Sequence, residues 1–155
     1  MKILVAAKRV IDYNVQIRVK DDGSGVHTEN VKMSTNPPDD NAIEESVKLK
    51  ESGKVKEVIA ISIGEDKAQE TIRKALAVGA DRGIHVKSDT YIEPLGIAKI
   101  LKKIVEKEKP DMVFLGKQAI DDDCNQTGQM LAAMLNWPQA TFSSKLNLKE
   151  KSLEV

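Results

Sequence analysis

The chain has 155 residues, which is enough for one hydrophobic core and short for two. Its 24 basic and 24 acidic side chains leave no net charge to attract nucleic acid or an anionic membrane, so we expect neither as a partner. No stretch approaches the roughly 18 apolar residues of a membrane helix, and a single cysteine excludes an internal disulfide. We predict one globular domain over residues 1–155, without membrane insertion.

The first strand is expected near the N-terminus, followed by an exposed hairpin. Residues 3–7 form a continuous apolar run, which is typical of a strand buried on both faces. Residues 15–19 alternate apolar and polar side chains, and the sequence DDGSG after them contains the residues that turns favour. This pattern predicts a hairpin between residues 15–20 and 26–32.

Two consecutive prolines mark the next boundary. Because proline restricts the backbone and lacks an N–H, Pro37 and Pro38 predict a rigid loop without regular structure. One of the polar residues 39–41 is then expected to cap a helix that ends at Gly53.

From residue 56 onward, expected strands and helices alternate. The strands are predicted at 56–64, 83–87 and 111–116, and the helices at 66–79, 91–109 and 125–137. In the first of these helices, Ile72, Ala75, Leu76 and Val78 are expected to face the core. The alternation predicts an α/β fold with a mainly parallel sheet and helices on both faces. We expect it to be Rossmann-like or adenine-nucleotide α-hydrolase-like, with the β-hairpin after the first strand.

A parallel sheet of this kind binds ligands at the carboxyl ends of its strands. Three loops leave those ends, after Ala6, after Ile63 and from Gly116 onward, and the last is the longest. Neither GxGxxG nor GxxxxGK[ST] occurs in the chain, so the common dinucleotide and P-loop fingerprints are missing. The long third loop is therefore the main candidate for a binding site.

That loop belongs to the segment GKQAIDDDCNQTGQM, residues 116–130. Gly116 allows a close backbone approach, and residues 125–128 open a helix whose free N–H groups attract an anion. One interpretation is a phosphate held at residues 125–128; the other is a plain helix cap by Asp123 or Asn125. Spacing alone does not separate the two.

The polar residues of this segment allow several roles. The aspartates 121–123 suit hydrogen bonds to ribose hydroxyls, helix capping or coordination of a cation such as Mg²⁺, although all three cannot face a phosphate. A thiolate at Cys124 would be stabilised beside a helix start, but no base lies near it in sequence, which favours a structural role. His27 and His85 are expected to be structural or solvent-facing.

Several segments together resemble the β subunits of electron transfer flavoproteins. The matching sequences, which run in order over the whole chain, are KRVIDY at 8–13, NP at 36–37, QETIRKALAVGADRGIHV at 69–86, GKQAIDDDCNQTGQM at 116–130 and WPQATF at 137–142. The resemblance implies a subunit that binds AMP as a structural nucleotide, or a second FAD in electron-bifurcating relatives.

Carried over by motif, the resemblance also implies a set of site residues. Tyr13 would approach the FAD of a partner subunit, and residues 125–127 would hold the AMP phosphate. The full AMP site would comprise Ala6, Asn36, Pro37, Pro38, Asp39, Ile63, Gly116, Lys117, Gln118, Ala119, Ile120, Asp121, Asp122, Asp123, Cys124, Asn125, Gln126 and Thr127.

The implied role is electron transport without catalytic turnover of its own. The family's β subunit pairs with an α subunit that holds most of the FAD contacts. This heterodimer accepts electrons from acyl-CoA and other dehydrogenases, as in fatty acid oxidation, and passes them to a quinone oxidoreductase. The implied location is the cytoplasm for a bacterial source and the mitochondrial matrix for a eukaryotic one.

Two departures from the family pattern bear on these expectations. The family usually has an aromatic residue after NP, where this chain has Pro38. Family members are also longer, and the strand-like sequence after residue 141, with a turn at 149–152 and a second strand from 153, indicates a fragment that lacks the dehydrogenase-docking loop and the C-terminal arm. Two other functions remain open: a stand-alone adenine-nucleotide-binding regulatory domain like the universal stress proteins, and a Mg²⁺-dependent nucleotide hydrolase using aspartates 121–123.

Overall fold

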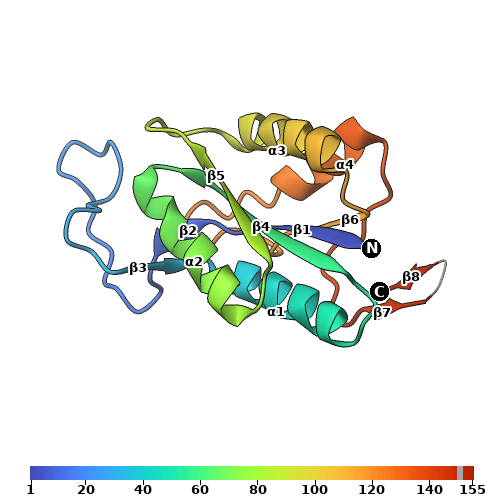
Figure 1. Cartoon of the computed structure of the whole chain (residues 1–155). Coiled ribbons are helices and arrows are strands. Elements are labelled where there is room, and N and C mark those ends of the chain that lie inside the picture. The colour runs from blue at the N-terminus through green and yellow to red at the C-terminus, as the bar shows by residue number, and fades with distance from the viewer. Residues whose placement is uncertain (150–151) are drawn as a thin grey trace.

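A computed structural model of the chain, which describes residues 1–149 and 152–155, is centred on four parallel strands (Figure 1). In space they follow the order β5-β4-β1-β6. Because β4 and β6 pair with opposite edges of β1, the strand order reverses beside β1. A reversal of this kind opens a crevice at the carboxyl ends of the strands, where α/β proteins bind ligands. The strands are β1 (Lys2–Ala6), β4 (Glu57–Gly64), β5 (Arg82–Lys87) and β6 (Met112–Phe114).

Helices cover both faces of this sheet, as expected from the alternating sequence. Helices α1 (Pro37–Glu51) and α2 (Gln69–Val78) lie on one face, and α3 (Pro94–Glu108) and α4 (Thr127–Leu135) lie on the other (Figure 1). A short 3₁₀ turn, η1 (Asp66–Ala68), leads into α2. The expected α/β fold with a parallel sheet is confirmed.

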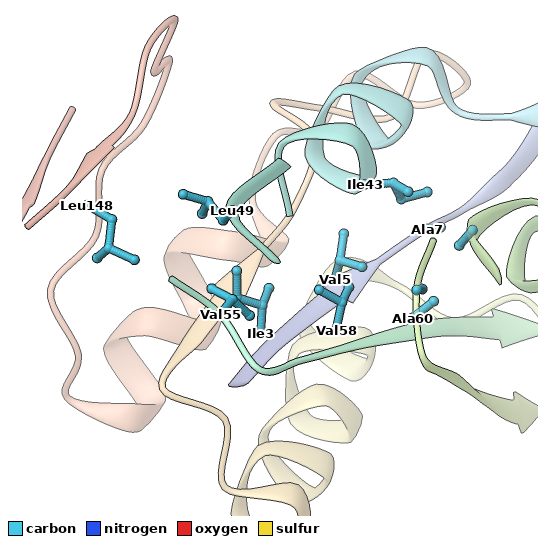
Figure 2. Packing of buried hydrophobic residues seen from close by; sticks show 11 residues of the cluster. Ile3, Val5, Ala7, Ile43, Leu49, Val55, Val58, Ala60 and Leu148 are labelled. Atoms are coloured by element: carbon cyan, nitrogen blue, oxygen red, sulfur yellow. The ribbon is translucent and has the colours of Figure 1, made fainter. Parts of the chain in front are cut away.

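Side-chain alternation along the strands divides the core into two layers. Ile3 and Val5 of β1 pack with Ile43 of α1 in the first layer, which Figure 2 shows. Leu4, between them in sequence, packs with Leu101 of α3 in the second layer. Successive side chains of a strand point to opposite faces, so a continuous apolar run is what a strand covered on both faces requires.

The prediction of an irregular loop at the two prolines is wrong, because α1 begins there. Asn36 is the N-cap residue, and Pro37 and Pro38 are the first two residues of the helix. The N–H groups of the first turn have no acceptor within the helix, so proline loses no hydrogen bond there. Its fixed backbone angle also suits a helix start. Asp39 therefore lies inside the first turn of α1, and the residues 39–41 do not cap the helix.

The antiparallel pair after the first strand has shorter and different strands from those expected. It is formed by β2 (Arg9–Ile11) and β3 (Met33–Thr35). The predicted strands 15–20 and 26–32 contribute only a single bridge between Val19 and Val26, in an arm that projects beyond β2 and β3 (Figure 1). With Ile17 and Val19 exposed, this arm has no second layer to pack against, and longer pairing gains little from burial.

Helix α2 buries a narrower stripe than predicted. Ile72 and Ala75 are in the core as expected, but the predictions for Leu76 and Val78 are wrong, since these residues are 39% and 41% exposed. Although Leu76 and Val78 follow Ile72 and Ala75 at helical spacing, they lie on the two flanks of the buried stripe, which is formed by Thr71, Ile72 and Ala75. In the described residues, no helix has both the length and the apolar character needed to cross a bilayer.

The C-terminal segment forms an antiparallel pair, as its sequence pattern indicates, but its first strand begins at Asn147 and not at residue 141. Strands β7 (Asn147–Leu148) and β8 (Leu153–Glu154) pair with each other at the end of the molecule opposite the projecting arm (Figure 1). Leu148 packs against the first core layer near Leu49 (Figure 2). Part of the predicted turn at 149–152 lies outside the described residues.

Candidate functional site

The predicted site residues meet at the strand-order reversal. Ala6 ends β1, Ile63 lies at the end of β4, and the loop 115–126 connects β6 to α4. Most of these residues, together with Asn36 at the start of α1, line one continuous hollow in the surface. Of the predicted site residues, Pro37, Ile120 and Asp123 do not line it. From the sequence, the general rule for parallel sheets placed Ala6, Ile63 and the loop together, and the family resemblance added Asn36. The structure shows that the same hollow also receives Lys8.

The amide side chain of Asn36 holds the middle of the loop 115–126. Its Nδ2 donates to the carbonyl oxygen of Gln118 at 2.8 Å, and its Oδ1 accepts from the amide of Ile120 at 3.1 Å. Only 1% of Asn36 is exposed, so its polar atoms depend on these partners. An asparagine at the N-cap usually binds its own helix; here no side-chain cap bond is made, and the side chain binds the loop instead.

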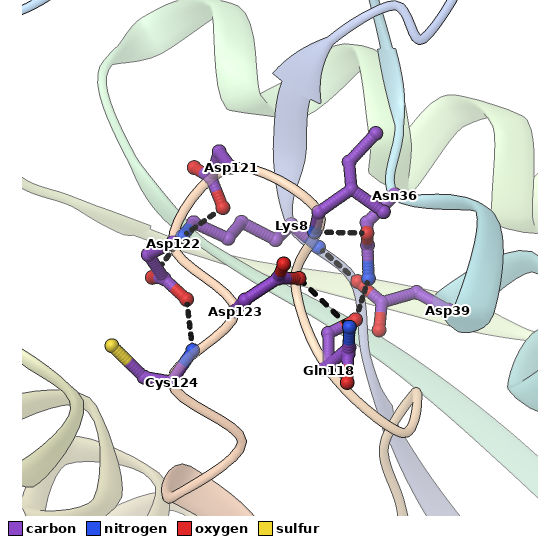
Figure 3. A network of polar contacts seen from close by, with 9 residues as sticks. Lys8, Asn36, Asp39, Gln118, Asp121, Asp122, Asp123 and Cys124 are labelled. Atoms are coloured by element: carbon purple, nitrogen blue, oxygen red, sulfur yellow. Dashed lines mark hydrogen bonds and ion pairs between the residues drawn. The ribbon is translucent and has the colours of Figure 1, made fainter.

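The carboxylate of Asp39 joins the ends of the two adjacent strands. Its Oδ2 accepts from the amide of Lys8, just after β1, at 2.8 Å, and its Oδ1 accepts from the amide of Gly116, just after β6, at 3.0 Å. Burial, which disfavours a charged carboxylate, raises the pKa of Asp39 to about 6, although these amides and Asn36 act in the opposite direction. Figure 3 shows the side chains of Asn36 and Asp39 close to each other at one side of the loop.

Gly116 is required by the protein itself at this point. A Cβ added to it would lie 2.3 Å from Oδ1 of Asp39, and 2.6 Å from both the Asp39 nitrogen and the carbonyl carbon of Pro38. The sequence interpretation assigned its close approach to a ligand. In the structure the close neighbour is the first turn of α1, which leaves no room for a side chain.

Lys8 explains how the loop accommodates three consecutive aspartates. Its ammonium lies 2.8 Å from Oδ1 of Asp121 and 2.9 Å from Oδ2 of Asp122. Burial opposes the charged ammonium, but the bonds and attraction to these two carboxylates outweigh it and raise the pKa of Lys8. The third carboxylate, Asp123, turns away and accepts from Nε2 of Gln118 at 2.7 Å (Figure 3). The three charges thus have separate partners and do not gather at one point.

Sequence reasoning did not include Lys8 among the site residues. The only signal was its place, a cation directly after a buried strand that ends beside the candidate loop. Asp121 and Asp122 lie 113 and 114 residues away in sequence, so no local pattern links them to it.

The start of α4 is open to an acceptor. Gln126 is the N-cap residue and makes no side-chain cap bond. The amide of Met130 reaches the carbonyl of Gln126, whereas within residues 1–149 and 152–155 those of Thr127, Gly128 and Gln129 have no protein acceptor. The plain cap by Asp123 or Asn125 is therefore not what the structure contains. Unpaired amides at a helix start favour an anion.

Two other predicted residues lie at the edge of this arrangement. Cys124 is exposed, and desolvation together with the nearby Asp122 carboxylate raises the pKa of its thiol, so the helix start does not make it a reactive thiolate. Tyr13 follows β2 with 72% of its surface exposed. Its ring is therefore available to a partner chain.

His85, on β5, contacts the end of the neighbouring strand β4. Nε2 of His85 lies 3.0 Å from the carbonyl oxygen of Gly64 at the end of β4. Among the residues that the structure describes, no three His, Cys, Asp or Glu side chains are arranged to hold a metal ion.

Comparison with known proteins gives consistent matches. The model of the electron transfer flavoprotein domain matches residues 24–155. The chain is 60% identical over all its 155 residues to the electron transfer flavoprotein subunit beta of Dictyostelium discoideum, and 61% identical to that of Bradyrhizobium diazoefficiens. It is 58% identical over 159 residues to the human protein of that name. The chain covers 62% of the length of each of these three relatives.

Proposed function

The chain belongs to the electron transfer flavoprotein family, among its β subunits, and from this premise we propose that it is the AMP-binding core of a heterodimeric electron carrier. The complete carrier accepts electrons from acyl-CoA and other dehydrogenases and passes them to a quinone oxidoreductase. FAD is the redox group and is held mainly by the α subunit. The β subunit carries no turnover of its own.

The observation that carries the AMP proposal is the open start of α4. The amides of Thr127, Gly128 and Gln129 are free of protein acceptors among the described residues and sit at the positive end of the helix dipole. A phosphate supplies oxygens that accept hydrogen bonds from such amides. The apolar side chains of Ala6 and Ile63, across the same hollow, suit the adenine end of the ligand.

Lys8 makes an acidic loop compatible with an anionic ligand. Without its ammonium, Asp121 and Asp122 would present two unpaired carboxylates in the hollow that receives the phosphate. The two ion pairs cancel part of that repulsion, while the carboxylate oxygens keep lone pairs for hydroxyl donors. We assign these aspartates to the ribose hydroxyls and assign the phosphate to α4.

Tyr13 is proposed as the contact to the flavin. It lies at the base of the projecting arm, exposed and beside the short strand β2. An aromatic ring at a protein interface supplies a large apolar contact, so Tyr13 would shape the surroundings of the α subunit's flavin without transferring protons. The related protein of Arabidopsis thaliana is named as mitochondrial, and we propose the mitochondrial matrix for a eukaryotic source and the cytoplasm for a bacterial one.

Two measurements test this proposal. Small molecules released by denaturing the purified chain and identified by mass spectrometry should contain AMP in a stoichiometric amount. Co-expression with an α subunit should give a complex with flavin absorbance. Released FAD would assign the site to a second flavin, and preferred binding of ATP would favour the stand-alone regulatory domain. A chain that carries no nucleotide and elutes alone would contradict the proposal.

A further inference from the structure

The side chain of Asp39 is buried and binds the protein's own backbone. Both carboxylate oxygens accept backbone amides, from Lys8 and Gly116, and only 7% of the residue is exposed. Its neighbour Asp40 differs, because that carboxylate faces outward and pairs with Lys74 at 2.6 Å. The two consecutive aspartates in the first turn of α1 therefore have different tasks, one inside the fold and one at the surface.

We propose that Asp39 is a positioning residue that sets the nucleotide loop, and that AMP affinity depends on it without any contact between its side chain and AMP. This inference rests on the proposed AMP site. Asp39 fixes the distance between Lys8, just after the end of β1, and Gly116, near the start of the loop. Asn36, one turn earlier, fixes the loop at Gln118 and Ile120.

These contacts continue from the loop to the phosphate-binding amides. The amide of Asp123 donates to the carbonyl of Ala119 at 3.0 Å, and that of Cys124 donates to Oδ1 of Asp122 at 3.0 Å. Asp122 is in turn fixed by Lys8, whose own amide is held by Asp39. Hydrogen bonds and ion pairs thus lead from Asp39 through Lys8 and Asp122 to Cys124, which lies three residues before the start of α4 (Figure 3).

A loop ordered before binding gives tighter binding than a loop that must be ordered by its ligand. The segment 115–126 has no helix or strand of its own, so its order comes from side chains of other elements. An asparagine would not replace Asp39 equally well, because both carboxylate oxygens of Asp39 accept a backbone amide. Asparagine offers one acceptor oxygen, and its NH₂ group would face the second backbone amide, donor against donor.

Asp39→Asn and its matched control Asp40→Asn test the proposal in the chain of 155 residues. By calorimetric titration, Asp39→Asn should weaken AMP binding by about tenfold, the order expected when one hydrogen bond to a charged group is lost. Asp40→Asn should bind like the wild type. Hydrogen exchange without nucleotide should be faster at Gly116 and Ile120 in Asp39→Asn, and unchanged in the strand β4.

The possible results distinguish a failure of the AMP site from a failure of the positioning role of Asp39. Equal AMP affinity and equal loop exchange in Asp39→Asn and wild type would overturn the positioning role. If the wild type binds no AMP but loop exchange still accelerates in Asp39→Asn, the AMP site fails while the positioning of the loop stands.

The wild type supplies a readout that needs no variant, should Asp39→Asn fail to fold. The amide resonances of Lys8 and Gly116 should shift with pH along one shared titration, because one carboxyl group accepts both. Lys8, Asp40, Asp121 and Asp122 are the other charged groups nearby, and none of them accepts both amides. Two unrelated titration midpoints would overturn the shared contact.

Discussion

Two connections leave the carboxyl end of the sheet on either side of β1, and they are built differently. After β4, Glu65 leads at once into η1 and α2, and Ala68, Ile72 and Ala75 bury their side chains against the sheet. After β6, the loop 115–126 runs without regular structure and is held by Asn36, Asp39 and Lys8 from elsewhere in the chain.

The difference shows how a binding loop can be rigid without packing into a core. The β4 connection is stabilised by apolar burial close by in sequence. The β6 connection is stabilised by polar side chains 77 to 114 residues away. A polar loop keeps its backbone groups available to a ligand, and the rigid start of α1 gives it a fixed shape.

The largest expected effect comes from Gly116→Ala, which breaks the contact between the loop and α1. The new Cβ would lie within 2.6 Å of backbone atoms of Pro38 and Asp39, which cannot move aside as a flexible side chain could. We expect a loss of about 3 kcal/mol or more in the free energy of unfolding, measured in urea. Gly128→Ala is the control, because its Cβ would meet only Leu115 at 3.8 Å. Equal losses in the two variants would contradict the close contact.

The pH dependence of stability tests the burial of the Asp39 carboxylate. Its pKa of about 6 in the folded chain exceeds the unfolded value of 3.8, so the folded state holds the proton more tightly. Relative to that of Asp39→Asn, the free energy of unfolding of the wild type should be highest below pH 3.8. It should fall by about 3 kcal/mol as the pH rises past 6. The difference between the two unfolding curves removes the contribution of groups they share. A wild type that gains stability over this interval would mean that the amide bonds outweigh burial.

Lys8→Met tests whether neutralising the aspartates matters for the ligand. With Asp121 and Asp122 left unpaired, AMP affinity should fall by about tenfold, and more at low salt, where repulsion is screened less. Adding Asp122→Asn to this variant should restore part of the affinity. Arg9→Met is the matched control, since Arg9 pairs with the exposed Glu70. Equal affinities of the Lys8 and Arg9 variants would refute the role of Lys8.

The smallest effect is expected from Lys74→Ala, at the outer side of the same first turn of α1. The Asp40–Lys74 pair is close, but its side chains are 31% and 48% exposed. Solvent-exposed pairs contribute little, and we expect a change within about 0.5 kcal/mol in the free energy of unfolding. A loss comparable to that of Gly116→Ala would show that the outer face of this turn also holds the loop.

The sequence predicted the sheet and its helices because these elements depend on local patterns. The apolar run in β1 and the spacing of Ile72 and Ala75 report burial directly. Prolines gave the wrong answer at the start of α1, because Pro37 and Pro38 fit a first helical turn as well as a loop.

The location of the candidate site was also predictable, since the carboxyl ends of parallel strands meet at one edge. The residues that hold it were not. Asn36 was included because NP at 36–37 matches the family. Its bonds to Gln118 and Ile120 join distant parts of the sequence, so no periodic pattern of residues indicates them. Lys8 is one cation among 24 basic residues until the fold brings it to Asp121.

Titration of the isotope-labelled chain with AMP, followed amide by amide in NMR spectra, tests most directly whether the start of α4 binds the nucleotide. We expect saturable shifts of the Thr127, Gly128 and Gln129 amides, smaller shifts in the loop 115–126, and none at the opposite end of the sheet. A titration that leaves the three α4 amides unmoved, or that moves a different surface, would contradict the proposed site.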